Sequence, residues 1–188
     1  MRLHVRVLAC AAVLLCAAGC GTPSRPPGKA AAESGPPSVQ AFSINPFASV
    51  ALPASRMQVH TDAVKVLGRP RETLTRDAPS EHDPRIVNSI ITLRYAFGDL
   101  VYLHVAGKDV ENLILIQLRG NQLPLKYGIR LGETTREQIV KLFGPPQDTQ
   151  ENSLSYNVPF TQEITNSTTF YFREQTLLQI DISSLMMD

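Results

Sequence analysis

Residues 131–146 read LGETTREQIVKLFGPP and form the best-specified stretch of the chain. Thr134 or Thr135 can act as a helix N-cap, because each is followed three residues later by a Glu or Gln that completes a capping box. Apolar residues spaced i, i+3 and i+4 from Ile139 fall on one helix face. Gly144 and the two prolines after it end the helix. This stretch therefore predicts a short, capped helix with a sharp stop.

A weaker copy of this pattern lies upstream and predicts a first helix over 56–67. Ser55 and Gln58 form a capping pair, and Gly68 precedes the stop at Arg69 and Pro70. The polar residues up to about residue 89 then predict an exposed loop. The chain thus shows one unit twice, with different loop lengths.

Strand-like runs follow each predicted helix. Residues rich in β-branched and aromatic side chains predict strands at 90–96, 100–106, 112–118, 153–157, 168–172 and 176–182. Two of these runs share the order Leu-x-Tyr, at Leu93 to Tyr95 and at Leu154 to Tyr156. Alternation places Val101, Leu103 and Val105 on one face, and Leu178, Ile180 and Ile182 on one face of the last strand.

Residues 1–19 read as an export signal. Arg2 and Arg6 precede an apolar run, 7–18, that is shorter than the about 20 residues a spanning helix needs. The run ends in Ala-Ala-Gly before Cys20, which resembles the lipobox of bacterial lipoproteins and makes Cys20 the lipid-attachment (palmitate-bearing) residue. By the same resemblance, Gly21 rather than Asp implies sorting to the outer membrane. The alternatives are an ordinary secretory signal with a chance cysteine, or acylation at Cys16, which two bulky leucines disfavour.

Residues 20–53 are predicted to be a disordered tether, since seven of the fourteen prolines lie there. Phe42, Ile44 and Phe47 break this pattern. We expect them to dock on the domain as its first segment, and the alternative is a partner-binding motif within the arm.

Composition narrows the classes of function. All three cysteines lie at or before residue 20, which excludes disulfides and thiolate metal sites from the folded part. The full chain has a net charge of +1, and removal of the signal with Arg2 and Arg6 leaves the mature chain near neutrality. We therefore expect no nucleic-acid partner.

The pattern of capped helix, Gly-x-Pro stop, Leu-x-Tyr strand and terminal hairpin resembles the SmpA/OmlA (BamE-like) family of outer-membrane lipoproteins. Two such units in tandem are similar to β-lactamase inhibitor protein. The resemblance implies an α+β fold of two tandem helix-plus-antiparallel-sheet units, spanning 54–124 and 125–188. This chain departs from those families at Leu154, where they commonly carry tryptophan.

A search for catalytic motifs finds no nucleophile elbow, metalloprotease motif or phosphate loop in the sequence. Glu81, His82 and Asp83 are expected to form a loop salt-bridge cluster rather than a metal site. His60 and His104 are expected to be structural. The arginines at 69, 71, 76 and 85 suggest either anionic headgroup contact or, as we prefer, a solvated loop with offsetting acids. The sequence thus predicts a protein that is not an enzyme and uses no cofactor or metal.

The functional expectation is an outer-membrane-anchored, periplasm-facing lipoprotein that binds another envelope protein as an accessory or scaffold module. Its expected partners are the membrane, through the lipid, and an envelope protein that docks on the sheet face or loops. Tyr127, Tyr156 and Phe160 are the candidate contact residues. The alternative is a small-molecule or lipid binder, which a pocket lined by Tyr95, Tyr102 and Phe172 would favour.

Overall fold

The computed structural model describes residues 37–49, 57–80, 83, 85–108, 110–159 and 164–186, all within one compact unit. Its helices are α1 (Val39–Ile44), α2 (His60–Leu67) and α3 (Arg136–Phe143), with a 3₁₀ turn, η2, at Lys126–Gly128. Its strands are β1 (Glu72–Pro79), β2 (Val87–Tyr95), β3 (Gly98–Val105), β4 (Val110–Leu118), β5 (Asp148–Gln150), β6 (Ser153–Pro159), β7 (Ile164–Arg173) and β8 (Thr176–Met186). No helix in these described ranges is long and apolar enough to cross a bilayer.

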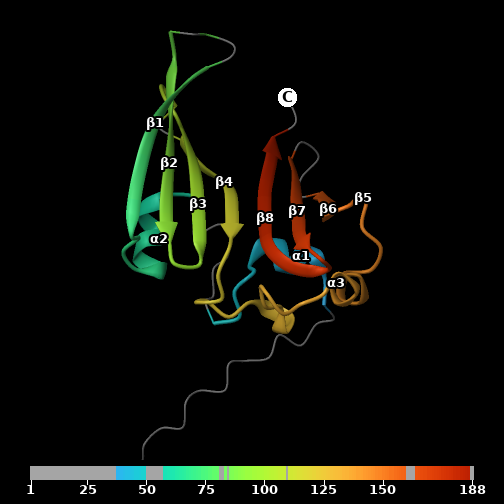
Figure 1. Ribbon diagram of the computed structural model, residues 1–188. Coiled ribbons are helices and arrows are strands. Elements are labelled where there is room, and N and C mark those ends of the chain that lie inside the picture. The colour runs from blue at the N-terminus through green and yellow to red at the C-terminus, as the bar shows by residue number, and fades with distance from the viewer. Residues whose placement is uncertain are drawn as a thin grey trace, which may run out of the picture. The chain divides into compact units, whose positions relative to one another are not determined.

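All eight strands belong to one antiparallel sheet with the order β1-β2-β3-β4-β8-β7-β6-β5 (Figure 1). The join between its halves is the pairing of β4 with β8, which runs from Leu115 opposite Ser183 to Leu118 opposite Ile180. The prediction of two tandem helix-plus-sheet units is therefore wrong. The described part of the chain is mostly a single sheet with three short helices, because the apolar strand β4 finds its second neighbour in β8.

The predicted loop between the first helix and residue 89 contains strand β1, which forms one edge of the sheet. Seven of its eight residues are exposed. An edge strand exposed on both faces needs no apolar alternation, so the sequence pattern that marks other strands is missing here.

Helix α3 confirms the short, capped helix predicted within residues 131–146. Thr135 is its N-cap, and Thr135 and Gln138 form both hydrogen bonds of the capping box. Gly144 ends it at φ 81° and ψ −168°, a conformation essentially restricted to glycine.

Helix α2 starts at His60, later than predicted, and its N-cap Val59 makes no side-chain hydrogen bond. The cap comes from β4 instead: the carboxylate of Glu111 accepts the His60 amide at 2.5 Å and also contacts His60 Nδ1 at 2.9 Å. A side chain distant in sequence thus replaces the expected Ser55–Gln58 cap, and Ser55 itself lies outside the described residues.

Helix α1 lies within the predicted tether, and its Phe42 is fully buried. The Phe42 ring packs against the rings of Phe143 and Phe170, at centroid distances of 5.8 and 6.0 Å. Phe47, just after α1, is 1% exposed. The prediction that this segment docks on the domain is confirmed for both phenylalanines.

The helices and the core occupy one face of the sheet. On β3 this face carries Leu100 and Tyr102, both fully buried, while Val101 and Leu103 lie on the other face and are half-buried. On β8, a register shift opposite Tyr171 and Phe172 buries Leu177 and leaves Leu178 39% exposed. Leu178 therefore does not join Ile180 and Ile182 in the core, as alternation alone predicted, because a bulge reverses the alternation there.

Candidate interaction surface

The face of the sheet opposite the helices is the candidate site. In Figure 1, α2 lies behind β1–β3 and α1 lies behind β7 and β8, so the near face carries no helix. Cross-strand partners point to the same side of a sheet, which allows this open face to be traced residue by residue through the register.

One row of polar residues crosses the open face and takes one residue from each strand. In order across the sheet, the row is Glu72, Arg94, Asp99, Gln117, Asp181, Thr169, Ser155 and Asp148. The Arg94 guanidinium donates to the Glu72 carboxylate at 2.8 Å, and Arg119 donates to Asp99. The Ser155 and Thr169 hydroxyls are 3.0 Å apart. Neighbouring strands are thus linked on this face by side-chain hydrogen bonds.

Asp181 lies at the centre of this row and is half-buried. Burial raises the pKa of its carboxyl group, while hydrogen bonds from Gln117 and Gln179 and the charge of Arg119 act in the opposite direction. The two amide donors lie 3.3 and 2.9 Å from the carboxylate oxygens of Asp181. The sequence indicated that this side chain points away from the core, and the register confirms that orientation.

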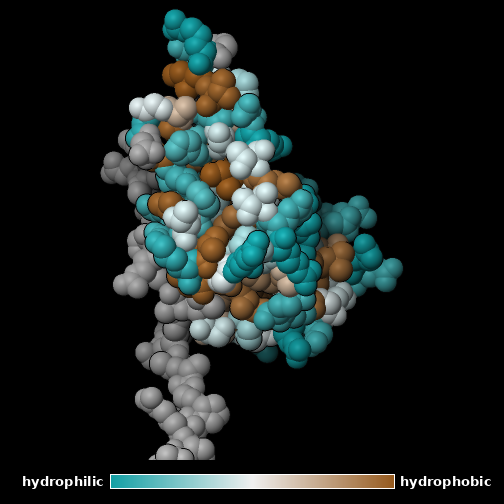
Figure 2. Space-filling view, turned by 90° about the vertical axis from the view of Figure 1, so that its left-hand side faces the viewer, coloured by the Kyte–Doolittle hydropathy of each residue, from teal (hydrophilic) through white to brown (hydrophobic). Residues whose placement is uncertain are grey.

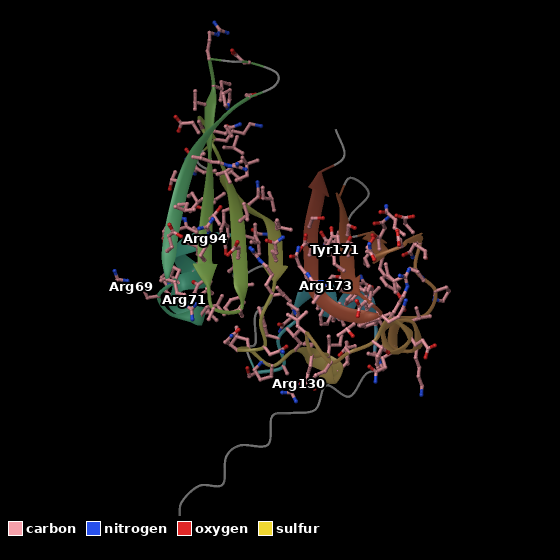
Figure 3. All side chains as sticks on the ribbon, viewed as in Figure 1. Arg69, Arg71, Arg94, Arg130, Tyr171 and Arg173 are labelled. Atoms are coloured by element: carbon pink, nitrogen blue, oxygen red, sulfur yellow. The ribbon has the colours of Figure 1, made fainter. Side chains whose placement is uncertain are left out.

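Tyr171 is the exposed aromatic residue beside Asp181. It faces Gln179 on β8 and Ser153 on β6, and 38% of its surface is accessible. Burial and the nearby Asp181 charge both raise the pKa of the Tyr171 hydroxyl. Figure 3 shows Tyr171 on β7, with Arg173 near the same end of the strand. We call the group Gln117, Ser155, Thr169, Tyr171, Gln179 and Asp181 the polar half-face.

The other half of the open face is more apolar. Leu74, Thr92, Val101, Leu115 and Ser183 form a row across β1, β2, β3, β4 and β8. Ile90 and Leu103 are paired in the adjacent row. The open face therefore offers apolar contact area on one side and hydrogen-bonding groups on the other.

Two of the three predicted contact residues, Tyr127 and Tyr156, are described by the structure, and neither joins this face. Tyr156 is 1% exposed and its hydroxyl donates to the Gly144 carbonyl oxygen at 2.9 Å, so it is a core residue with no surface for a partner. Tyr127 adopts φ 58° and packs its ring against Phe42 and Phe143. Phe160 and Cys20 lie outside the described residues.

Tyr127 also lines an open groove of about 630 Å³ beside α3, whose charged lining residues are Arg130, Glu133 and Lys141. This groove is separate from the pocket that we considered for a small ligand. Tyr102 is fully buried and Phe172 is 5% exposed, while Tyr95 stacks on Phe97 at a centroid distance of 5.0 Å. Those three residues belong to a filled core and its edge and do not line one pocket.

Some of the arginines and histidines singled out in the sequence pair with a carboxylate of the same chain. Arg85 pairs with Asp83 at 2.9 Å, as expected for a loop salt bridge. His60 pairs with Glu111. Arg69 and Arg71 lie near the lower end of β1 (Figure 3), and neither forms an ion pair with a carboxylate in the part of the chain that the structure describes.

Sequence reasoning missed Tyr171. The alternation of Phe170 and Phe172 indicated that the residue between them points outward. The sequence does not show the partner strand, since only the register places Gln179 opposite Tyr171 and Asp181 near its ring.

Comparison with known proteins gives no match to a protein-family model, to a curated protein or to a solved structure.

Proposed function

We propose that this chain is an outer-membrane lipoprotein, anchored through Cys20 and facing the periplasm, that binds another envelope protein through the open face of its sheet. It acts without catalysis, as an accessory or scaffold module. The signal-like residues 1–19 and the small residues before Cys20 support the anchor. The observation that carries the binding role is the exposed Tyr171 ring beside the half-buried Asp181.

The chemistry of the polar half-face suits a protein partner. Tyrosine is enriched among the residues that dominate protein–protein binding energy, because it combines a large rigid ring with a hydroxyl. Around it, the Gln117 and Gln179 amides and the Ser155 hydroxyl supply donors and acceptors that can match a partner's backbone. Adjacent Leu115 and Val101 add apolar area on the same face.

Site-specific photocrosslinking in intact cells tests the binding role. A photoreactive amino acid at position 171 should give one dominant adduct with an envelope protein. The matched control places the same probe at Val140, which is 36% exposed on α3 and lies on the helix side of the molecule. Equal adducts from both positions, or none from position 171, would contradict binding through the open face.

Substitutions of Tyr171 then distinguish the contribution of its ring to binding from that of its hydroxyl. Tyr171→Ala should abolish the adduct seen from a second probe on the open face, at Ser155, whereas Tyr171→Phe should retain most of it. The anchor is tested separately by Cys20→Ser, which should release the protein from the membrane fraction and prevent palmitate labelling. Retention of label in that variant would refute the assignment of Cys20.

A further inference from the structure

Strand β1 forms an edge of the sheet whose outer side has no strand neighbour among the described residues. Glu72, Thr73, Leu74, Thr75, Arg76 and Asp77 are all exposed, and Leu74 has 39% of its surface accessible. Figure 2 looks onto the side of the molecule that carries β1, where hydrophobic groups lie among hydrophilic ones. A free edge of this length is a template for another strand.

The direction of the backbone groups follows from the β1–β2 register. The Ser80 amide donates to the Ile86 carbonyl oxygen at 2.9 Å, which continues the register beyond Pro79 opposite Val87. Because bonded residues alternate in an antiparallel pair, even-numbered residues of β1 bond to β2. The amides and carbonyls of Thr73, Thr75 and Asp77 therefore point outward. Pro79, which has no amide hydrogen, also stands at an outward position, where edge strands tolerate proline.

We propose that β1 pairs with β1 of a second copy of this chain, antiparallel and centred on Leu74. In this register Thr73 of one copy faces Thr75 of the other, and the two symmetric Thr pairs can form four backbone hydrogen bonds. The two Leu74 side chains meet across the twofold axis in a pair without hydrogen bonds, where side chains lie closest. The result is one sheet that continues from copy to copy.

The charges on β1 fit this register. Glu72 of one copy faces Arg76 of the other, so this opposite-charge pair forms twice across the twofold axis. Arg71 precedes β1, and its amide donates to the Arg94 carbonyl oxygen at 2.7 Å, so Arg71 does not extend the outward pairing. Arg76 makes no ion pair within the described part of its own chain, and Glu72 is shared with Arg94. Opposite charges directly across an antiparallel pair are favourable and like charges are unfavourable.

Other registers lose this match. A shift of two residues places Leu74 opposite Glu72 or Arg76. A shift of four residues places Glu72 opposite itself in one direction, and Arg76 opposite itself in the other. A shift by one residue places the outward backbone groups of one copy opposite inward backbone groups of the other, so hydrogen bonds between the copies are lost. The same charges that favour the symmetric register thus disfavour pairing with a strand of unrelated sequence.

Cysteine trapping tests the register directly. In the proposed pair the two Leu74 Cα atoms lie about 4.5 Å apart, within the range that a disulfide spans. Full-length Leu74→Cys should give a reducible dimer on mild oxidation. Ala78→Cys is the matched control, because its two copies would lie about 26 Å apart at 3.3 Å per residue. Wild type carries the same natural cysteines and sets the background.

A dimer yield from Leu74→Cys no higher than from Ala78→Cys or wild type would overturn the proposal. So would a Leu74→Cys adduct with a different protein, which would assign the edge to another partner.

Charge exchange supplies an independent measurement that separates misfolding from loss of pairing. In the Leu74→Cys background, Glu72→Arg places Arg opposite Arg76, and Arg76→Glu places Glu opposite Glu72. Each variant alone should lose several-fold in dimer yield while its melting temperature stays near that of the parent. Mixing the two restores both opposite-charge pairs, so the yield should return as a mixed dimer. Equal yields from the separate variants and the mixture would refute this pairing.

Discussion

The Tyr156 hydroxyl donates a 2.9 Å hydrogen bond to the Gly144 carbonyl oxygen, which ties β6 to the end of α3. Tyr95 makes the corresponding bond to Gly68 at the end of α2, at 3.1 Å. Each glycine has φ 81°, so each tyrosine holds a helix stop that only glycine adopts easily.

We expect Tyr156→Phe to lower the free energy of unfolding by about 1 kcal/mol, because a part-buried carbonyl loses its partner. For a chain of this size the melting temperature should fall by about 2–4 °C. Tyr95→Phe is the matched control. It should cost less, since its bond is exposed to water. A larger loss from Tyr95→Phe would contradict the role assigned to Tyr156.

The packing of α1 makes a second prediction. Phe42→Ala removes a fully buried ring and should cost about 3–5 kcal/mol in thermal or denaturant unfolding. Phe143→Ala should cost less, because Phe143 is only half-buried. If Phe42→Ala left the melting curve unchanged, α1 would not be part of the folded unit.

Gly98 begins β3 where a side chain has no space. A Cβ atom there would lie 1.8 Å from the Gln117 carbonyl oxygen, and the residue has φ 146°. Gly98→Ala should therefore disrupt the β3–β4 pairing at a cost of about 4 kcal/mol or more. Gly107→Ala is the control: its φ is 82° but nothing lies within 4 Å of the added carbon, so only backbone strain of about 1–2 kcal/mol is expected. Equal costs would rule out the clash as the cause.

Glu111 should stabilise the start of α2. Glu111→Ala removes the acceptor of the His60 amide and should cost about 1–2 kcal/mol, as loss of an N-cap does. Glu111→Gln keeps an acceptor oxygen and should recover most of that loss. Chemical denaturation of the three proteins at one pH measures both effects.

The raised pKa of Asp181 predicts a pH dependence. Its carboxyl group binds a proton more tightly in the folded state, so its contribution to stability is fully present below the unfolded-state pKa and is lost as the pH rises through the folded-state pKa. Asp181→Asn, which carries no charge at any pH, should melt higher than wild type at neutral pH. The difference should shrink as the pH falls through the acidic range.

Asp99→Asn is the comparison for that experiment, since it removes the partner of Arg119 and should not stabilise the protein at neutral pH. If Asp181→Asn were less stable than wild type at neutral pH, the hydrogen bonds from Gln117 and Gln179 would outweigh the cost of burying the charge.

Local signals in the sequence were sufficient for α3 and for six of the strands. The Thr135 cap, the Gly144 stop and the β-branched runs act over a few residues, so they can be recognised without knowing the fold. Strand β1 was missed because its exposed position leaves its composition polar, and β5 because it has only three residues. The faces of β3 were ambiguous because Leu100 and Tyr102 alternate with Val101 and Leu103, so both faces are apolar.

The arrangement of the sheet and the candidate surface depend on long-range pairing. Nothing near Leu115 in the sequence shows that Ser183 will be its neighbour, and nothing near Tyr156 shows that the ring will be covered by Phe143 and Phe170. Alternation indicates which residues share a face of a strand, but tertiary contacts decide which face is covered.

The pairing of β4 with β8 limits the order in which the sheet can be completed. Until Ile180 to Ser183 pair with it, the outer edge of β4 is a bare apolar strand that includes Leu115 and Ile116. A nascent chain in that state exposes a site for aggregation. Completion of the sheet must therefore wait for the last strand, which covers the Leu115–Leu118 edge.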